Sequence, residues 1–195
     1  MREVFKNLYV GNQQDYETGT FTPSEWAFLL AAKEPWHRQA LGYTGRAADK
    51  NHPEYLMAYR HDKLILNLVD APKSIFFNKD IIDAALHYIE LQFELGKKVL
   101  VCCNQGESRS PSIALLYLIK HGIIKSDTLE DAETEFLKVY PEYNPGAGIR
   151  GFVKEHWMEY MYSDCIIGID LGKGNSRKGF VKEHWRHYIN DKKNP

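Results

Sequence analysis

The sequence predicts an α/β fold in which a central, mostly parallel sheet is flanked by helices. Short apolar, β-branched runs alternate along the chain with longer stretches whose apolar residues recur at helical spacing. Strands interleaved with helices in this way favour a parallel sheet that is covered on both faces. The chain has 195 residues, 44% hydrophobic and 26% charged, which is typical of one soluble domain with a single core.

The apolar patterns place four strands and four helices along the chain. We expect the strands at residues 8–11, 26–31, 63–69 and 98–102. We expect the helices at residues 78–95, 111–121, 129–140 and 148–160. The strand at 63–69 is predicted to be central, because it fills with apolar residues. Gly96 and Gly122 are expected to end the first two helices, Pro141 is expected to stop the third, and Asp127 or Thr128 to cap it.

A cysteine and an arginine, separated by five residues, lie between the strand at 98–102 and the following helix. A loop that leads into a helix start aims backbone N–H groups inward and forms an anion cradle. The same field favours the thiolate of Cys103, which is the nucleophilic form. Arg109 offers a planar, two-pronged donor to phosphate oxygens, and Gly106 permits a tight turn. The Ser110 hydroxyl is expected to donate to the Cys103 sulfur, so the loop is predicted to bind and attack a dianion.

The segment 103–112, Cys-Asn-Gln-Gly-Glu-Ser-Arg-Ser-Pro-Ser, resembles the signature loop of the cysteine-dependent protein tyrosine phosphatases, in particular their dual-specificity branch. Residues 7–13 resemble the first strand of that branch, 66–70 the strand that delivers its general acid, and 140–145 its closing segment. The resemblance covers about residues 5–161. It implies a phosphotyrosine protein phosphatase-like fold and hydrolysis of phosphotyrosine, with phosphoserine and phosphothreonine also open, through a phosphocysteine intermediate.

The resemblance also implies a role for each matching residue. Cys103 matches the nucleophile, Arg109 the phosphate-binding arginine, and Ser110 the hydroxyl that assists breakdown of the intermediate. Asp70 matches the general acid, and its alternative is a turn carboxylate before Pro72. The expected phosphate-binding residues are Asn104, Gln105, Gly106, Glu107, Ser108 and Arg109. No cofactor is implied, and the histidines lack metal-ligand spacing, so no metal is expected.

The position directly before the nucleophile departs from the family pattern. The family usually has a histidine there, which helps to orient the loop, and this chain has Cys102. Two interpretations remain open: Cys102 is a buried strand residue, or it traps an oxidised Cys103 in a disulfide that would be strained between neighbours. The missing histidine also keeps open a binding-only pseudophosphatase.

Other substrate classes remain open besides phosphoproteins, namely an RNA 5′-phosphate end or a phosphoinositide. Relatives that act on such molecules usually carry extra basic residues near the loop, whereas this loop carries the acidic Glu107. The formal net charge of −1 gives no whole-chain attraction to nucleic acid or to a membrane. A phosphoprotein substrate is therefore the expected partner, and neither nucleic acid nor a membrane is expected.

We expect one catalytic domain, residues 1–162, followed by a C-terminal extension, residues 163–195. Residues 33–62 form an insertion that is either a surface segment with a short helix or a wall of the substrate cleft, where Arg38 or Arg46 would supply positive charge. In the extension, the sequence Gly-Phe-Val-Lys-Glu-His-Trp of residues 151–157 recurs, either as a surface helix or as a segment that swaps in a dimer.

A cytoplasmic location is expected. The chain begins without the apolar run of a signal peptide, and its three cysteines do not form a disulfide framework. A thiol nucleophile must also stay reduced, which favours a reducing compartment.

Overall fold

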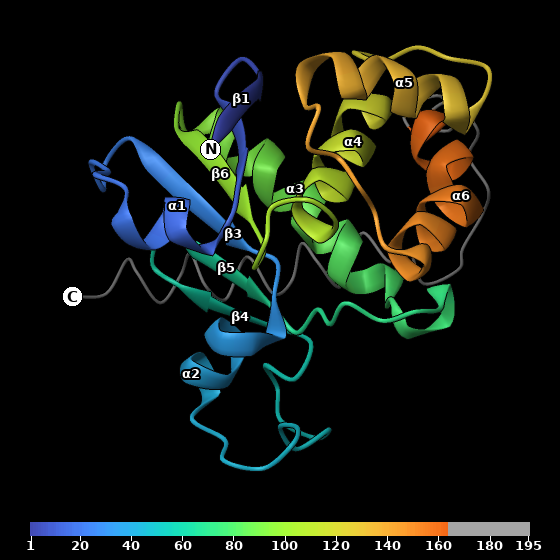
Figure 1. Ribbon diagram of the computed structural model, residues 1–195. Coiled ribbons are helices and arrows are strands. Elements are labelled where there is room, and N and C mark those ends of the chain that lie inside the picture. The colour runs from blue at the N-terminus through green and yellow to red at the C-terminus, as the bar shows by residue number, and fades with distance from the viewer. Residues whose placement is uncertain (164–195) are drawn as a thin grey trace, which may run out of the picture. The chain divides into compact units, whose positions relative to one another are not determined.

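The computed structural model describes residues 1–163, which form an α/β domain around a six-stranded sheet (Figure 1). The strands are β1 (Arg2–Phe5), β2 (Leu8–Gly11), β3 (Trp26–Leu30), β4 (Met57–Arg60), β5 (Lys63–Leu66) and β6 (Lys98–Cys102). The helices are α1 (Gln13–Thr18), α2 (Arg38–Leu41), α3 (Lys79–Glu94), α4 (Arg109–Lys120), α5 (Leu129–Val139) and α6 (Ala147–Met161). Two short turns complete the set, the π-helical η1 (Lys33–His37) and the 3₁₀ turn η2 (Ser74–Phe76).

The sheet is parallel at its centre and antiparallel at both edges. Its strand order is β1-β2-β6-β3-β5-β4, and the pairings β2·β6, β6·β3 and β3·β5 are parallel. Strands β1 and β4 pair antiparallel with β2 and β5. Each is joined to its neighbour by a tight turn that contains a left-handed residue, Asn7 (φ 66°) or His61 (φ 53°), as short hairpins require. The predicted mostly parallel sheet is therefore correct only for the inner four strands.

The strand predicted at 63–69 is shorter than expected and is not central. Strand β5 ends at Leu66 and lies between β3 and the edge strand β4, whereas β6 lies between β2 and β3. In the register of the sheet, Cys102 at the end of β6 lies between Gly11 and Leu30. The carboxyl ends of the parallel strands therefore meet at the end of β6, which is where α/β sheets bind their ligands.

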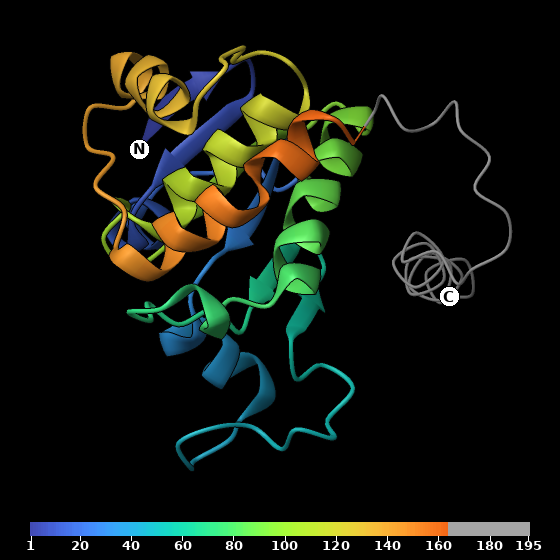
Figure 2. The ribbon, with the colours of Figure 1, turned by 90° about the vertical axis from the view of Figure 1, so that its right-hand side faces the viewer.

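The two faces of the sheet are covered differently. Helices α3 and α4 pack against β6 and its neighbours, and α5 and α6 pack against α4, so that these four helices lie on one side of the sheet (Figures 1 and 2). The other face carries a hydrophobic cluster from the strands, α1, η1 and α2. Its buried and partly buried members include Trp26, Phe28, Leu30, Cys102, Trp36, Tyr16 and Leu41.

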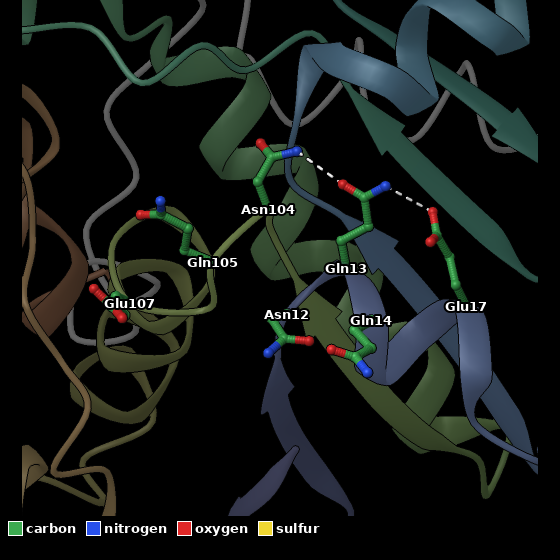
Figure 3. Close-up of a pocket in the computed structure, with 7 residues that line it drawn as sticks. All are labelled: Asn12, Gln13, Gln14, Glu17, Asn104, Gln105 and Glu107. Carbon is green, nitrogen blue, oxygen red and sulfur yellow. Dashed lines mark hydrogen bonds between the residues drawn. The ribbon is translucent and has the colours of Figure 1, made fainter.

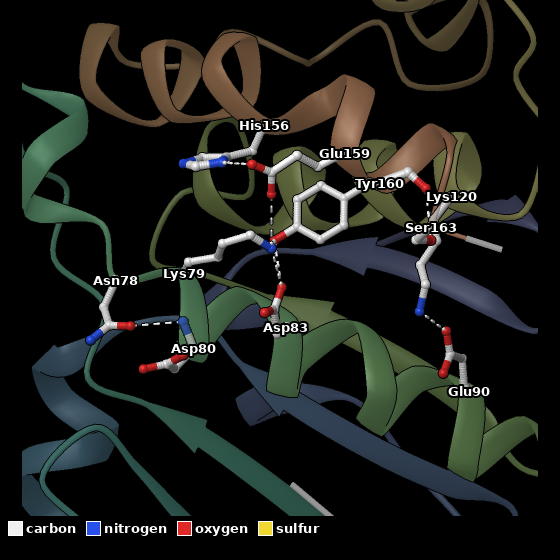
Figure 4. A network of polar contacts seen from close by, with 10 residues as sticks. All are labelled: Asn78, Lys79, Asp80, Asp83, Glu90, Lys120, His156, Glu159, Tyr160 and Ser163. Carbon is white, nitrogen blue, oxygen red and sulfur yellow. Dashed lines mark hydrogen bonds and ion pairs between the residues drawn. The ribbon is translucent and has the colours of Figure 1, made fainter. Parts of the chain in front are cut away.

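Polar contacts join α3 and α6 on the face of the sheet that these helices cover (Figure 4). Lys79 of α3 lies 2.9 Å from the Asp83 carboxylate and 3.5 Å from that of Glu159 in α6. The Tyr160 hydroxyl of α6 donates to the same Asp83 carboxylate at 2.7 Å. These contacts fix α6 on α3, and α6 in turn begins beside the loop that carries Asp70.

The insertion contains a short helix, as expected, and also the edge strand β4, which the sequence did not predict. It is anchored rather than purely superficial, because Trp36 and His37 are buried. Arg38 forms an ion pair with Glu34 at 2.7 Å and donates to two loop carbonyl groups. The positive charge of Arg38 is therefore paired inside the insertion, whereas Arg46 is exposed. The loop between α2 and β4 protrudes from the body of the domain (Figure 1).

The first copy of the repeated segment, residues 151–157, lies in α6. The second copy and the rest of the extension beyond residue 163 lie outside the described residues. Among residues 1–163, no helix combines the length and the apolar character that crossing a membrane requires.

Candidate active site

The loop between β6 and α4 brings Cys103 and Ser110 into contact. Cys103 directly follows β6 and is only 1% exposed. Ser110 lies in the first turn of α4, and its hydroxyl donates to the Cys103 sulfur, with an Oγ–Sγ distance of 3.2 Å. The Gly11 carbonyl oxygen, at 3.3 Å, is a second acceptor for the same hydroxyl. The sulfur therefore lies at the N-terminal end of α4, where the helix dipole favours negative charge.

Arg109, the first residue of α4, is buried with part of its guanidinium unpaired. Its Nη1 donates to the Leu68 carbonyl oxygen at 3.0 Å, and its Nη2 donates to Asn104 Oδ1 at 2.7 Å. Its buried Nε has no hydrogen-bond partner among the described residues. A buried donor left unpaired costs about 1–3 kcal/mol, so this edge of the guanidinium suits an anion that accepts from two nitrogens.

The shape of the loop is held from two sides. Gly106 has a φ of 80°, and a Cβ built there would lie 3.1 Å from the Gly11 oxygen and 3.2 Å from the Asn12 nitrogen. On the other side, the Tyr140 hydroxyl donates to the Gly106 carbonyl oxygen at 2.9 Å. Burial raises the pKa of Tyr140 well above its usual value, so this hydroxyl keeps the proton that it donates. The Asn144 N–H also donates to the Glu107 carbonyl oxygen, at 2.8 Å.

Asp70 lies on the loop that follows β5, and its side chain is exposed. A Cβ built on Gly146 would lie 3.2 Å from Asp70 Oδ1 and 3.6 Å from Ser108 Oγ. The Gly146 N–H in turn donates to Ser108 Oγ at 3.0 Å. The Asp70 carboxylate and the Ser108 hydroxyl therefore both lie close to Gly146, at the N-terminal end of α6. The aspartates nearest to Asp70 in sequence lie elsewhere: Asp62 in the β4–β5 turn, and Asp80 and Asp83 in α3.

The loop that carries Asp70 is packed tightly against α6. A Cβ built on Gly148 would lie only 2.0 Å from the Ala71 carbonyl oxygen. Only a glycine allows the helix to approach the loop backbone this closely. The start of α6 therefore determines where the Asp70 loop runs.

Cys102 belongs to the core. It is fully buried in the hydrophobic cluster with Leu30 and Trp36. Burial raises the pKa of its thiol well above the usual value, which keeps the group protonated. These observations favour the interpretation of Cys102 as a buried strand residue. Both Cys102 and Cys103 are free thiols.

A polar cavity of about 560 Å³ lies beside the loop (Figure 3). Its lining residues are Asn12, Gln13, Gln14, Glu17, Asn104, Gln105 and Glu107. The lining contains amides and two carboxylates and no basic side chain. Gln105 and Glu107 lie on one side and the α1 residues on the other, with Asn104 hydrogen-bonded to Gln13 (Figure 3).

Three contacts of this site could not be predicted from sequence: those that Gln13, Leu68 and Tyr140 make with the loop. These residues are far from the loop along the chain, and no spacing rule relates them to it. All three residues lie in segments that resemble the family, 7–13, 66–70 and 140–145, but the resemblance assigns no loop contact to them. Within residues 1–163, no group of three or more His, Cys, Asp or Glu side chains is arranged to hold a metal ion.

Comparison with known proteins bears on the fold. The sequence matches no protein-family model and no curated protein. Among solved structures, human tyrosine phosphatase-like serine/threonine/tyrosine-interacting protein is 19% identical, with a TM-score of 0.57 over 83% of this chain and 97% of that chain. DUSP15 is 17% identical, with a TM-score of 0.58 over 89% of this chain and 98% of that chain.

PTPMT1 in complex with PI(5)P is 14% identical, with a TM-score of 0.56 over 83% of this chain and 97% of that chain. Residues 1–163 therefore have the α/β fold of the dual-specificity phosphatases.

Proposed function

We propose that the chain is a protein phosphatase that hydrolyses phosphotyrosine, and also phosphoserine and phosphothreonine, through a phosphocysteine formed on Cys103. One observation carries the proposal: the Ser110 hydroxyl lies 3.2 Å from the Cys103 sulfur at the start of α4, directly beside the buried Arg109. The proposed nucleophile and its hydrogen-bond donor are thus in contact at the start of the helix whose first residue is the proposed anion-binding arginine. The phosphatase-like fold of the described residues supports the same function.

In the first step, the Cys103 thiolate attacks the phosphorus atom. The S–P bond forms as the P–O bond to the substrate breaks. Asp70 gives its proton to the leaving alkoxide or phenoxide oxygen, so that the product leaves as a neutral alcohol or phenol. Arg109 and the backbone N–H groups of the loop bind the non-bridging oxygens, on which charge spreads in the transition state.

In the second step, water attacks the phosphorus atom of the phosphocysteine. The Asp70 carboxylate takes a proton from the water as the new P–O bond forms. The S–P bond breaks, and the electron pair returns to the sulfur, where the Ser110 hydroxyl stabilises the departing thiolate. Inorganic phosphate is released, and the thiolate and the carboxylic acid are restored for the next cycle.

The charges around the site favour a phosphoprotein over a polyphosphorylated lipid or an RNA end. PTPMT1 has been solved with PI(5)P, so a lipid substrate remains the main alternative for a chain of this fold. Here, however, the cavity beside the loop carries Glu17 and Glu107 and no basic side chain. Extra phosphate groups would be repelled there. A cytoplasmic location is part of the proposal, because Cys103 must stay reduced.

The proposal is tested by phosphate release from p-nitrophenyl phosphate under reducing conditions, in the wild type, Cys103→Ser and Asp70→Asn. We expect Cys103→Ser to abolish release, and Asp70→Asn to lower kcat by about 10²–10⁴-fold, the usual contribution of a general acid–base catalyst. Turnover that survives Cys103→Ser would overturn the mechanism. Absence of wild-type turnover, with vanadate still bound, would instead identify a binding-only pseudophosphatase, in line with the missing histidine at Cys102.

A further inference from the structure

Asn104, the residue after the nucleophile, connects Arg109 to α1 through a directional series of hydrogen bonds. Arg109 Nη2 donates to Asn104 Oδ1 at 2.7 Å. Asn104 Nδ2 donates to Gln13 Oε1 at 3.2 Å, and Gln13 Nε2 donates to Glu17 Oε1 at 2.7 Å (Figure 3). Each amide accepts at its oxygen and donates at its nitrogen. The series therefore runs from a cation, Arg109, to an anion, Glu17.

The same amide also reaches the insertion. Asn104 Nδ2 donates to the Glu34 carbonyl oxygen at 2.9 Å, so both of its N–H groups have acceptors. The other acceptor of Arg109, the Leu68 carbonyl oxygen, also receives the Lys33 N–H at 2.9 Å. Both protein acceptors of Arg109 are thus held by η1, the first turn of the insertion.

This arrangement leaves one edge of the guanidinium for a ligand. An arginine side chain has five N–H groups, and the two contacts above use one on each terminal nitrogen. The buried Nε has no partner, and it lies on the same edge of the planar group as Nη2. The contacts of Nη1 with Leu68 and of Nη2 with Asn104 together fix the plane of the guanidinium, and therefore the direction in which the Nε edge faces.

We propose that Asn104 is a positioning residue for phosphate binding: with Gln13 and the η1 backbone, it holds the Arg109 guanidinium in the orientation that receives two phosphate oxygens. Asn104 acts through Arg109 and not through the reacting atoms. The inference deepens the proposed function, because it makes α1 and the insertion parts of the phosphate site. The insertion then supports the site through the two acceptors of Arg109.

Direct binding of inorganic phosphate tests this inference without depending on turnover. Binding is measured by isothermal titration calorimetry in a Cys103→Ser background, alone and combined with Asn104→Ala, with Gln13→Leu, or with both. Since a hydrogen bond to a charged group contributes about 1.5–3 kcal/mol, we expect Asn104→Ala to raise the Kd for phosphate on the order of tenfold or more. Gln13→Leu should raise it roughly threefold, because the Arg109–Asn104 contact remains.

The two substitutions form a double-mutant cycle. If Gln13 acts through Asn104, adding Gln13→Leu to Asn104→Ala changes the Kd no further. Additive effects, or a Kd for Asn104→Ala within twofold of its parent, would overturn the proposal. Asn51→Ala, at an exposed position of the insertion, is the matched control, and thermal unfolding shows that each variant is folded. If the wild type binds phosphate as described but does not turn over substrate, only the proposed function fails.

Discussion

The hydroxyl of Ser110 has one proton and two acceptors, the Cys103 sulfur at 3.2 Å and the Gly11 carbonyl oxygen at 3.3 Å. Hydrogen bonds to charged acceptors are stronger than those to neutral ones. The proton should therefore shift toward the sulfur whenever the sulfur carries negative charge. In the proposed cycle the sulfur carries this charge before the first step and again at the end of the second step, when the thiolate departs from phosphorus.

Ser110→Ala tests this role. Loss of a hydrogen bond to a charged group, worth about 1.5–3 kcal/mol, should slow the breakdown of the phosphocysteine by tenfold or more and leave its formation nearly unchanged. Stopped-flow measurement with p-nitrophenyl phosphate should then show a burst of about one p-nitrophenol per site, followed by slow turnover. The control is Ser126→Ala, in the loop after α4. It removes a hydroxyl that has no hydrogen-bond partner among the described residues. A variant with normal steady-state turnover and no burst would exclude the role.

At the scale of elements, the signature loop depends on close contact with the β2–α1 junction. Gly106 combines a φ of 80° with a backbone approach in which a Cβ would lie only 3.1 Å from the Gly11 carbonyl oxygen, closer than an ordinary contact. The loop can therefore keep its shape only with glycine at this position. Its N–H groups could not otherwise converge on an anion.

Gly106→Ala should move the loop away from Gly11 and weaken vanadate binding by more than tenfold, because several backbone donors lose their alignment together. Gly122→Ala is the matched control. Gly122 also has a positive φ, of 61°, but a Cβ there would meet only the end of Lys125, at 3.7 Å. Both variants should lose stability, on the order of 1 kcal/mol for the left-handed residue, yet only Gly106→Ala should lose vanadate. Equal vanadate affinity in the two variants would contradict this account of the loop.

The insertion contains a buried histidine that makes its stability depend on pH. His37 is fully buried, with Nε2 at 3.0 Å from the Glu54 carbonyl oxygen and Nδ1 at 3.4 Å from the Tyr43 hydroxyl. Burial lowers the pKa of His37 below its ordinary value. The unfolded chain therefore binds a proton at a pH where the folded chain does not, so the stability contribution is complete above pH ~6.5 and is lost as the pH falls below it.

We expect the wild type to lose stability between pH 7.5 and pH 5.5 and His37→Gln to lose less over the same range. Urea unfolding at the two pH values measures the difference. The comparison of pH slopes, rather than of absolute stabilities, removes the cost of the substitution itself and the contributions of the other histidines. Parallel slopes in the two proteins would mean that His37 does not titrate differently in the folded and unfolded chains.

Much of the secondary structure could be predicted from the sequence. In these elements the apolar periodicity and the residues typical of element ends indicate the same boundaries. The long helix predicted at 78–95 is α3, with Asn78 as its cap, and the cap of α5 is Thr128, one of the two expected residues. The missed elements are short: β1, β4 and α1 have six residues or fewer. Over so few residues, a period of two cannot be told from a period of 3.6, and the pairing partners of an edge strand decide its structure.

The candidate site was predictable to the extent that it is contiguous in sequence. Cys103 and Ser110 lie in one loop and helix start, so their contact follows from a local rule. The Leu68 acceptor of Arg109 does not, because it follows β5, which β3 separates from β6 in the sheet. Asn104 lies in the loop, but its side chain is held by Gln13 and by the Glu34 carbonyl group, which are distant in sequence. The role of Asp70 as general acid remains a prediction, and the structure adds only that its carboxylate lies close to Gly146, whose N–H donates to the Ser108 hydroxyl.

At the scale of the whole molecule, attraction of phosphate does not come from overall charge. The net charge is −1, and the cavity beside the signature loop carries Glu17 and Glu107. Binding must then rest on Arg109 and on the backbone donors of the loop, which act over short distances. Substrates should accordingly be selected against additional negative charge near the phosphate.

Glu107→Lys should reverse this selection. Exposed charge pairs contribute about 0.2–1 kcal/mol, so the ratio of kcat/KM between acid-flanked and base-flanked phosphopeptides should rise roughly two- to fivefold. Steady-state assays of the two peptides at low ionic strength measure the ratio, and added salt should reduce the change. Glu94→Lys, at the exposed end of α3, is the control. A ratio that does not change in Glu107→Lys would show that Glu107 does not face the substrate.

The phosphocysteine intermediate on Cys103 is tested most directly by finding the phosphoryl group on the protein. Ser110→Ala is mixed with p-nitrophenyl phosphate, quenched in acid within the first turnover, digested and analysed by mass spectrometry. The proposed mechanism predicts one phosphoryl group on the peptide that contains Cys103, and none when the Cys103→Ser substitution is added. A phosphoryl group on another residue, or continued turnover without any labelled Cys103 peptide, would contradict it.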